Sequence, residues 1–427
     1  MKYLPIDCRL FIQNRSNLID KLDDNSISIL NSNDIMPTNS DGTMPFKQNS
    51  DLFWATGIDQ EESVLAIIKK NGSVSELLFV KETNEHIAIW EGAKLTKSSA
   101  TKTSGIEDVF WLSEMDKIIE IEIEGVSTMY LNKNIHNRAT KVVQTRDDRY
   151  RNYIAEKFPK KEIKEIAPIM HSLRCIKSNL EIELMQRACN ITEKGLRRIL
   201  PIIKPGIMEY EIEAELMHEF LSNRSTGFAY QPIIGSGANS CVLHYIENNK
   251  KCEDGDVLLM DFGAEYANYT SDLTRTVPVN GVFSNRQKNI YKSVLKVMKE
   301  ATNMLRPGTD HKQMQQEVVK IMEGELIKLK LFDQHDVKKQ DPKNPMYKKY
   351  FMHGTSHFLG LDVHDVGDTS FPMQPGMVFT CEPGIYIREE GIGIRLENDV
   401  LVTSGDPDDL MKNIPIELDE IESLMNE

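Results

Sequence analysis

Two segments of this 427-residue sequence repeat each other and place acidic residues at matching positions. Each copy has the pattern Gly-x-Val-x-x-x-acid-x-Gly, in which the acid is Asp261 in the first copy and Glu382 in the second. Each copy is followed by a further acid, Asp272 or Glu397. The repeat therefore predicts two similar units, each carrying a pair of carboxylates.

Four carboxylates that converge need a source of positive charge. Like charges close together raise one another's pKa and disfavour ionisation. Two divalent cations carry the charge that offsets four carboxylates, and two-metal sites hold ions ~3.5–4 Å apart around a shared water. The acids therefore predict a dinuclear metal site.

Histidines supply the remaining candidate ligands. The segment FMHGTSHFLGLDVHDVG (351–367) contains His353, His357 and His364, and His244 lies just before the first repeat. His353 and His357 have the i, i+4 spacing of H-E-x-x-H zinc sites, but Gly354 replaces the required glutamate, which excludes that motif. A site of oxygens with one imidazole suits Mn²⁺ better than a thiolate zinc site would, although Co²⁺ and Zn²⁺ can occupy similar ligands.

Strands and helices must position these side chains. We predict β-segments over 256–266, 274–279, 377–387 and 393–402, with helices over 208–222, 285–305 and 311–330. Ser178 and Glu181 form a capping box that predicts the start of another helix. The elements indicate an α+β domain over 171–427, built from two pseudo-twofold β-units. The two acids are further apart along the sequence in the second copy than in the first, which predicts a longer hairpin in the second copy.

The first part of the chain, 1–170, is predicted to be a separate α/β domain. Two apolar runs, 64–70 and 75–80, flank Asn71-Gly72, which is a type I′ turn signal. We expect a folded loop over 46–58 and a charged helix over 151–168 that leads to the domain boundary.

Composition narrows the class of protein. The chain is 40% hydrophobic and 27% charged, with a net charge of −14, so it should repel nucleic acid. The six cysteines show no CxxC spacing, which argues against a zinc ribbon or a disulfide scaffold and favours a reducing cytoplasm. We find no signal-peptide pattern and no apolar run of ~18 residues, so we expect a cytoplasmic protein without a membrane partner.

The motifs together resemble the pita-bread metallopeptidases, a family that includes methionine aminopeptidase, prolidase and aminopeptidase P. The segments MDFGAEYANYTSDLTRT, MHGTSHFLGLDVHDVG, CEPGIYI and GIGIRLEND carry the resemblance. FKQNSDLFWATG resembles the amino-terminal domain of aminopeptidase P, and SLRCIKSNLEIELM resembles the start of its catalytic domain. The resemblance implies a pita-bread catalytic domain preceded by a smaller α/β domain.

The resemblance also implies a set of metal ligands, namely Asp261, Asp272, His357, Glu382 and Glu397. Asp272 and Glu397 resemble the carboxylates that bridge two metal ions. Asp261 looks like the bidentate ligand of one ion, and His357 and Glu382 look like ligands of the other. A metal-activated water is then the nucleophile, with Glu382 as the candidate general base.

Five further residues resemble the substrate side of the site. His244 and His364 resemble contacts to the substrate carbonyl, and His353 resembles a substrate-binding histidine. Arg395 lies two residues before Glu397 on the same predicted strand face, as a supporting partner. Tyr386 resembles a residue with a supporting role.

The implied activity is that of an Xaa-Pro aminopeptidase, which removes an amino-terminal residue that precedes proline. A prolidase restricted to dipeptides shares the ligands and is the second candidate; the FKQNSDLFWATG segment favours the aminopeptidase. A non-catalytic pita-bread binding protein is the third, although no ligand is replaced here. The family's amino-terminal domain implies a homodimer or homotetramer.

Overall fold

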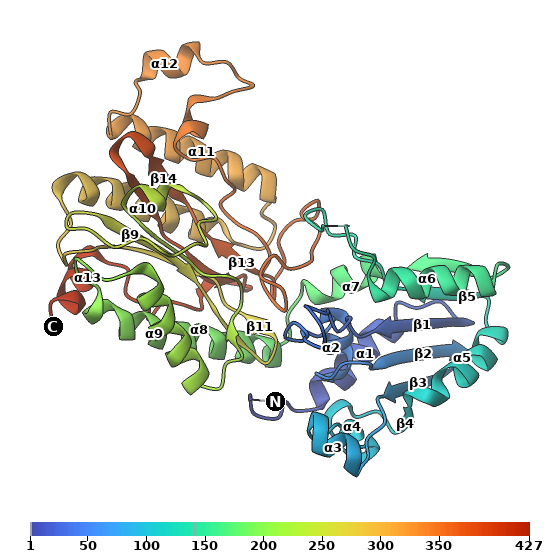
Figure 1. Cartoon of the computed structure of the whole chain (residues 1–427). Coiled ribbons are helices and arrows are strands. Elements are labelled where there is room, and N and C mark those ends of the chain that lie inside the picture. Colours follow the sequence, from blue (N-terminus) through green and yellow to red (C-terminus); the bar gives the residue numbers. More distant parts are fainter. Residues whose placement is uncertain (1, 141) are drawn as a thin grey trace. The chain divides into compact units, whose positions relative to one another are not determined.

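The computed structural model describes residues 2–140 and 142–427, which form two compact units, Tyr3–Arg174 and Cys175–Glu427. Figure 1 shows the elements of each unit in chain order. Each unit has its own sheets and its own hydrophobic interior. The metal-ligand candidates all lie in the second unit.

The first unit is a mixed α/β domain with a six-stranded sheet in the order β4-β3-β2-β1-β5-β6. Strands β1, β2 and β3 pair antiparallel, and β4, β5 and β6 join in parallel. Its elements are α1 (Arg9–Ile19), β1 (Ser26–Asn31), α2 (Ser50–Thr56), β2 (Val64–Lys70), β3 (Ser73–Val80), α3 (Glu85–Glu91), α4 (Lys97–Ser104), β4 (Asp108–Trp111), the 3₁₀ turn η1 (Leu112–Glu114), α5 (Met115–Glu124), β5 (Thr128–Leu131), α6 (Arg146–Lys157), β6 (Glu162–Glu165) and α7 (Ala167–Arg174).

The predicted hairpin is confirmed. Strands β2 and β3 close on the pair Lys70–Ser73. The two residues between them, Asn71 and Gly72, have φ values of 51° and 77°. Positive φ at both positions is the type I′ turn, whose twist matches that of the flanking strands.

Two expectations for this unit were wrong. The segment 46–58 contains a helix, α2, because the Asn49 side chain accepts hydrogen bonds from the backbone of Asp51 and Leu52 and so caps its start. The charged stretch 151–168 is not one helix. Helix α6 ends at Lys157, because Phe158 precedes Pro159 and leaves the helical conformation, and β6 then pairs with β5.

The second unit has short sheets with long helices packed against them. Its helices are α8 (Asn179–Ile199), η2 (Leu200–Ile202), α9 (Glu209–Ser222), η3 (Gly237–Cys241), α10 (Asn285–Met304), α11 (His311–Lys328), α12 (Gln334–Lys339), η4 (Met346–Lys349), η5 (Arg388–Glu390) and α13 (Leu418–Met425). Its strands are β7 (Gly227–Phe228), β8 (Ile233–Ser236), β9 (Val257–Phe262), β10 (Ala264–Tyr266), β11 (Tyr269–Thr270), β12 (Leu273–Pro278), β13 (Val378–Cys381), β14 (Gly384–Ile387), β15 (Ile392–Arg395), β16 (Asn398–Leu401) and β17 (Asp408–Asp409).

The predicted helices of this unit are confirmed. Helix α8 begins with the capping box, in which the Ser178 hydroxyl accepts from the Glu181 backbone and the Glu181 side chain accepts from Ser178. Helices α8 and α9 contact each other, as do α10 and α11. In Figure 1 the strands of this unit lie between these two helix pairs.

The sequence repeat corresponds to a repeated strand arrangement. In the first copy, β9 pairs antiparallel with β12, and the hairpin β10–β11 lies between them in sequence. In the second copy, β13 pairs antiparallel with β16, and the hairpin β14–β15 lies between them. The second hairpin is the longer one, as predicted, because its turn comprises residues 388–391 whereas the first turn comprises 267–268.

The long predicted β-segments are each broken in two. The break after β9 falls at Gly263, where a Cβ atom would lie 1.8 Å from the Ser271 carbonyl oxygen, so only glycine permits the close approach. The second copy breaks at 382–383 and at 396–397. These breaks place Glu382 and Glu397 just outside their strands. Among the described residues, no helix is long and apolar enough to cross a membrane.

Candidate metal centre

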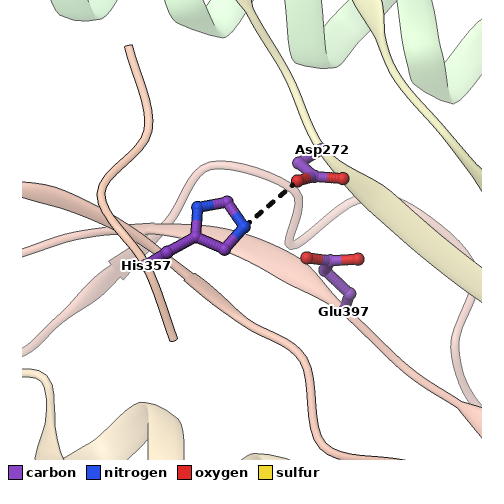
Figure 2. Close-up of side chains that lie close together, drawn as sticks. All are labelled: Asp272, His357 and Glu397. Atoms are coloured by element: carbon purple, nitrogen blue, oxygen red, sulfur yellow. Dashed lines mark ion pairs between the residues drawn. The ribbon is translucent and has the colours of Figure 1, made fainter. Parts of the chain in front are cut away.

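Three ligand-type side chains meet at the centre of the second unit. Asp272 directly precedes β12, Glu397 lies between β15 and β16, and His357 comes from the irregular segment before β13. One ligand atom from each lies within 4.8 Å of the other two. Figure 2 shows His357 pointing toward the carboxylates, with its Nε2 3.5 Å from Oδ2 of Asp272.

The other two predicted ligands adjoin this group. Oε1 of Glu382 lies 3.7 Å from His357 Nε2. Asp261, on β9, is joined to Asp272 by the Tyr230 hydroxyl, which lies 2.5 Å from Oδ1 of both carboxylates. The structure thus brings all five predicted ligands to one place.

The carboxylates are held in an environment that disfavours their charge. Burial, followed by repulsion from Asp272 and Glu382, raises the pKa of Glu397 well above its usual range. Burial raises the pKa of Glu382 to about 7, although His357 and Arg395 oppose the shift. Burial also raises the pKa of Asp261. Protons or cations must therefore neutralise this cluster, and oxygen ligands with one imidazole fit divalent cations.

The imidazole of His357 is oriented as a ligand. Its Nδ1 lies 2.9 Å from the Phe358 carbonyl oxygen, which can only accept a hydrogen bond. Nδ1 therefore carries a hydrogen, and Nε2 faces Asp272 and Glu382. Burial lowers the pKa of His357, but the hydrogen bond to Asp272 and the charge of Glu382 outweigh it and raise the net value. A cation at Nε2 would satisfy the same carboxylates.

Arg395, at the end of β15 in the second copy of the repeat, contacts the first copy. Its side chain donates to Asp261 at 2.5 Å and to the Thr274 hydroxyl at 3.0 Å, and that hydroxyl donates to Glu397 at 2.6 Å. Strand β15 ends at Arg395, so the expected shared strand face with Glu397 was wrong. The Thr274 hydroxyl thus links the side chains of Arg395 and Glu397.

His353 and Tyr386 form a connected pair beside Glu382. Arg395 donates to the Tyr386 hydroxyl at 2.8 Å, and this hydroxyl lies 2.8 Å from His353 Nε2. His353 Nδ1 carries a hydrogen because it faces the Gly354 carbonyl, so in the neutral ring Nε2 accepts from the Tyr386 hydroxyl. Burial, with the charge of Arg395 as the next cause, lowers the pKa of His353 to about 4. His353 is therefore neutral at pH 7, with Nδ1 donating to the Gly354 carbonyl.

The other two histidines predicted for the site, His244 and His364, are exposed. The His364 ring contacts the His357 ring edge to face, with centroids 4.5 Å apart. His244 lies in the irregular segment after η3.

Sequence reasoning missed Tyr230, Thr274 and Asp399. Tyr230 lies in the segment between β7 and β8, outside every recognised motif. Asp399 is fully buried, and its Oδ2 accepts from the Asp272 backbone at 3.0 Å. Its other oxygen has no hydrogen-bond partner among the described residues. Asp399 follows Glu397 by two residues in LEND, which was the only local signal.

Comparisons with known proteins agree along the whole chain. The profile described as metallopeptidase family M24 matches residues 183–404, and that of the aminopeptidase P N-terminal domain matches residues 11–130. The chain is 34% identical over 430 residues to the Xaa-Pro aminopeptidase of Escherichia coli (strain K12), with 97% of each chain covered. It is 29% identical over 403 residues to human Xaa-Pro aminopeptidase 3, covering 90% of this chain and 77% of that protein.

Solved structures give the same result. A structure described as a putative aminopeptidase P from Bacillus anthracis superposes with a TM-score of 0.93 at 34% identity, covering 99% of both chains. Zinc-substituted Escherichia coli aminopeptidase P in complex with product superposes with a TM-score of 0.90 at 33% identity, again covering 99% of both chains.

The raised pKa of Glu382 predicts a pH-dependent stability of the metal-free protein. An acid whose folded pKa lies above its ordinary value of 4.5 stabilises the fold when protonated, and this stability is lost as pH rises through about 7. We expect the free energy of unfolding, measured by denaturant titration of chelator-treated protein, to be lower at pH 8 than at pH 5. Glu382→Gln should reduce the difference. Equal stability at both pH values would contradict the assigned environment.

The Tyr230 hydroxyl predicts an effect on metal affinity. Tyr230→Phe removes the donor shared by Asp261 and Asp272, so metal affinity should fall by about 10–100-fold, as for other partners of ligand side chains. Isothermal titration with Mn²⁺ measures this. Tyr291→Phe is the matched control. The hydroxyl of this buried tyrosine donates to the backbone carbonyl of Ile416, which is not a candidate metal ligand. An unchanged affinity in Tyr230→Phe would remove this role.

Proposed function

We propose a residue-level mechanism from one premise, which is that this chain belongs to metallopeptidase family M24. It is a metal-dependent exopeptidase with Xaa-Pro aminopeptidase activity, since it matches such enzymes at 34% identity over 97% of its length and carries their N-terminal domain. The observation that supports the mechanism is the convergence of four carboxylates and one imidazole in the second unit.

The five convergent side chains are proposed to hold two divalent ions. Asp272 and Glu397 would bridge them, Asp261 would bind one, and His357 and Glu382 would bind the other. Mn²⁺ suits this ligand set, and Co²⁺ and Zn²⁺ are the alternatives. When bound, the ions lower the pKa of water to about 7 and so supply a nucleophile at neutral pH.

Glu382 is the proposed general base. Its carboxylate would take a proton from the attacking water and return it to the proline nitrogen, which leaves as a secondary amine. Its position supports this role, since Oε1 faces His357 at 3.7 Å and Oε2 faces His353 Nδ1 at 3.7 Å.

Histidines are proposed to orient the scissile carbonyl. The Xaa-Pro bond has no N–H to donate, so the carbonyl is the polar group of that bond available for recognition. His364 and His244 are exposed and can donate to it, whereas His353 is held neutral by burial and by the Tyr386–Arg395 chain. The substrate's free amine would lie near the metal site and Asp261.

We also propose a homo-oligomer, either a dimer or a tetramer, and a cytoplasmic location. The first is supported by Ile89 and Trp90 on α3, each of which is 78% exposed. The second is supported by the cysteines, all six of which are free thiols, as expected in a reducing compartment.

A two-peptide assay tests the function. The purified, Mn²⁺-loaded protein is offered the tripeptide Arg-Pro-Pro and the dipeptide Ala-Pro separately, and released amino acid is measured. We expect release of arginine from the tripeptide. Cleavage of the dipeptide alone would instead identify a prolidase, and cleavage of neither would indicate a non-catalytic protein.

Substitution of His364 tests its contact with the carbonyl. His364→Ala should leave the bound metal unchanged but lower kcat on Arg-Pro-Pro by about 10²–10³-fold, the loss seen when an oxyanion donor is removed. His218→Ala, at an exposed histidine on α9, is the control and should keep the wild-type rate. An unchanged kcat in His364→Ala would show that His364 is not a catalytic residue.

A further inference from the structure

A buried ion pair holds Asp365, a residue of segment 351–367, and has no role in the mechanism above. Lys177 Nζ lies 3.0 Å from Asp365 Oδ2, and each side chain is only 1% exposed. Lys177 directly precedes the capping residue of α8, and Asp365 directly follows His364. The pair therefore joins the start of the second unit to the segment that carries a substrate-side histidine.

Stability alone does not account for such a pair. Removing two charges from water costs more than their attraction commonly returns, and replacing a buried ion pair with apolar side chains is often neutral or stabilising. Lysine also loses much side-chain freedom when it is held in place. The pair's value therefore lies in the geometry that it imposes.

The contacts of Asp365 connect it to both His357 and His364. The Asp365 backbone donates to the Phe358 carbonyl at 3.0 Å. The same carbonyl accepts from Nδ1 of the metal-ligand candidate His357 at 2.9 Å. Asp365 is thus held by its backbone and its side chain, and the adjacent His364 ring packs against His357.

The loop between Phe358 and Asp365 is held in place by several close contacts. The Gly360 carbonyl accepts from both the backbone and the hydroxyl of Thr270, each at 2.8 Å. A Cβ atom at Gly360 would lie 2.2 Å from Asp365 Oδ2, so the loop folds directly onto this carboxylate. Lys177 is fixed as well, because its backbone donates to the Gly376 carbonyl at 2.8 Å.

We propose that Lys177 is a positioning residue for the peptidase reaction, which acts through Asp365 to hold His364 toward the substrate carbonyl. The proposal rests on the function proposed above for His364. Within the described part of the chain, the Lys177 ammonium pairs with Asp365 and with none of the five candidate metal ligands.

The first test replaces the charge and retains the side-chain bulk. Lys177→Met should lower kcat on Arg-Pro-Pro by about 10–100-fold, as expected for a misplaced catalytic group, with a smaller change in KM and unchanged bound Mn²⁺. Lys296→Met is the matched control. Lys296 pairs with Glu325 at 2.7 Å, between α10 and α11, and this variant should keep the wild-type kcat.

Lys177→Met leaves the Asp365 charge without this partner and could destabilise the fold. The double variant Lys177→Met/Asp365→Leu replaces the pair with apolar groups. It should recover the wild-type melting temperature and keep the wild-type bound metal, while kcat remains low. Recovery of kcat along with the melting temperature would reduce the pair to a structural role and overturn the proposal.

A double-mutant cycle then tests whether the effect passes through His364. In the His364→Ala background, Lys177→Met should cause no further loss of kcat. An equal loss in both backgrounds would overturn the proposal. If His364→Ala lowers kcat but Lys177→Met does not, the positioning role alone fails. If His364→Ala keeps the wild-type kcat, the function proposed for His364 fails and this inference fails with it.

Discussion

The constraint on which this structure depends is electrostatic, because four carboxylates are gathered where water has little access. Asp272 and Glu397 are 5% and 2% exposed, and Arg395 supplies one positive charge by pairing with Asp261. Neutral hydroxyl groups also donate hydrogen bonds to the carboxylates: Tyr230 contacts Asp261 and Asp272, and Thr274 contacts Glu397. These donors fix the carboxylate oxygens but do not remove their charge. Divalent cations are the natural complement to such a site.

The repeated strand arrangement explains how the acids converge. In each copy, an outer pair of strands encloses an inner hairpin, and the acids lie at or beside the ends of the outer strands. A residue just outside a strand does not have to follow the strict alternation of side chains across a sheet. Glu382 and Glu397 are therefore free to turn toward Asp272, while the ladders beside them keep their backbones fixed.

The histidines are held by a different part of the fold. His353, His357 and His364 come from an irregular segment, 351–367, whose position depends on contacts with residues distant in sequence, such as Thr270. The strand ladders therefore fix the backbone beside the four acids, whereas His357 reaches the same cluster from this irregular segment. Burial lowers the pKa of His353 to about 4, whereas His364 is exposed to solvent.

The sequence by itself determined the features that depend on local chemistry. The capping box at Ser178, the turn at Asn71-Gly72 and the periodicity of α10 are short-range patterns, and the matching acid pairs revealed the repeat. It could not determine which distant residues support the site. Tyr230 joins Asp261 to Asp272, and Arg395 turns to Asp261 instead of Glu397, because strand pairing brings these segments together. The breaks at Gly263 and beside Glu382, like the edge strand β6, were also decided by tertiary packing, since close backbone approach and pairing with a neighbouring strand have no local signature.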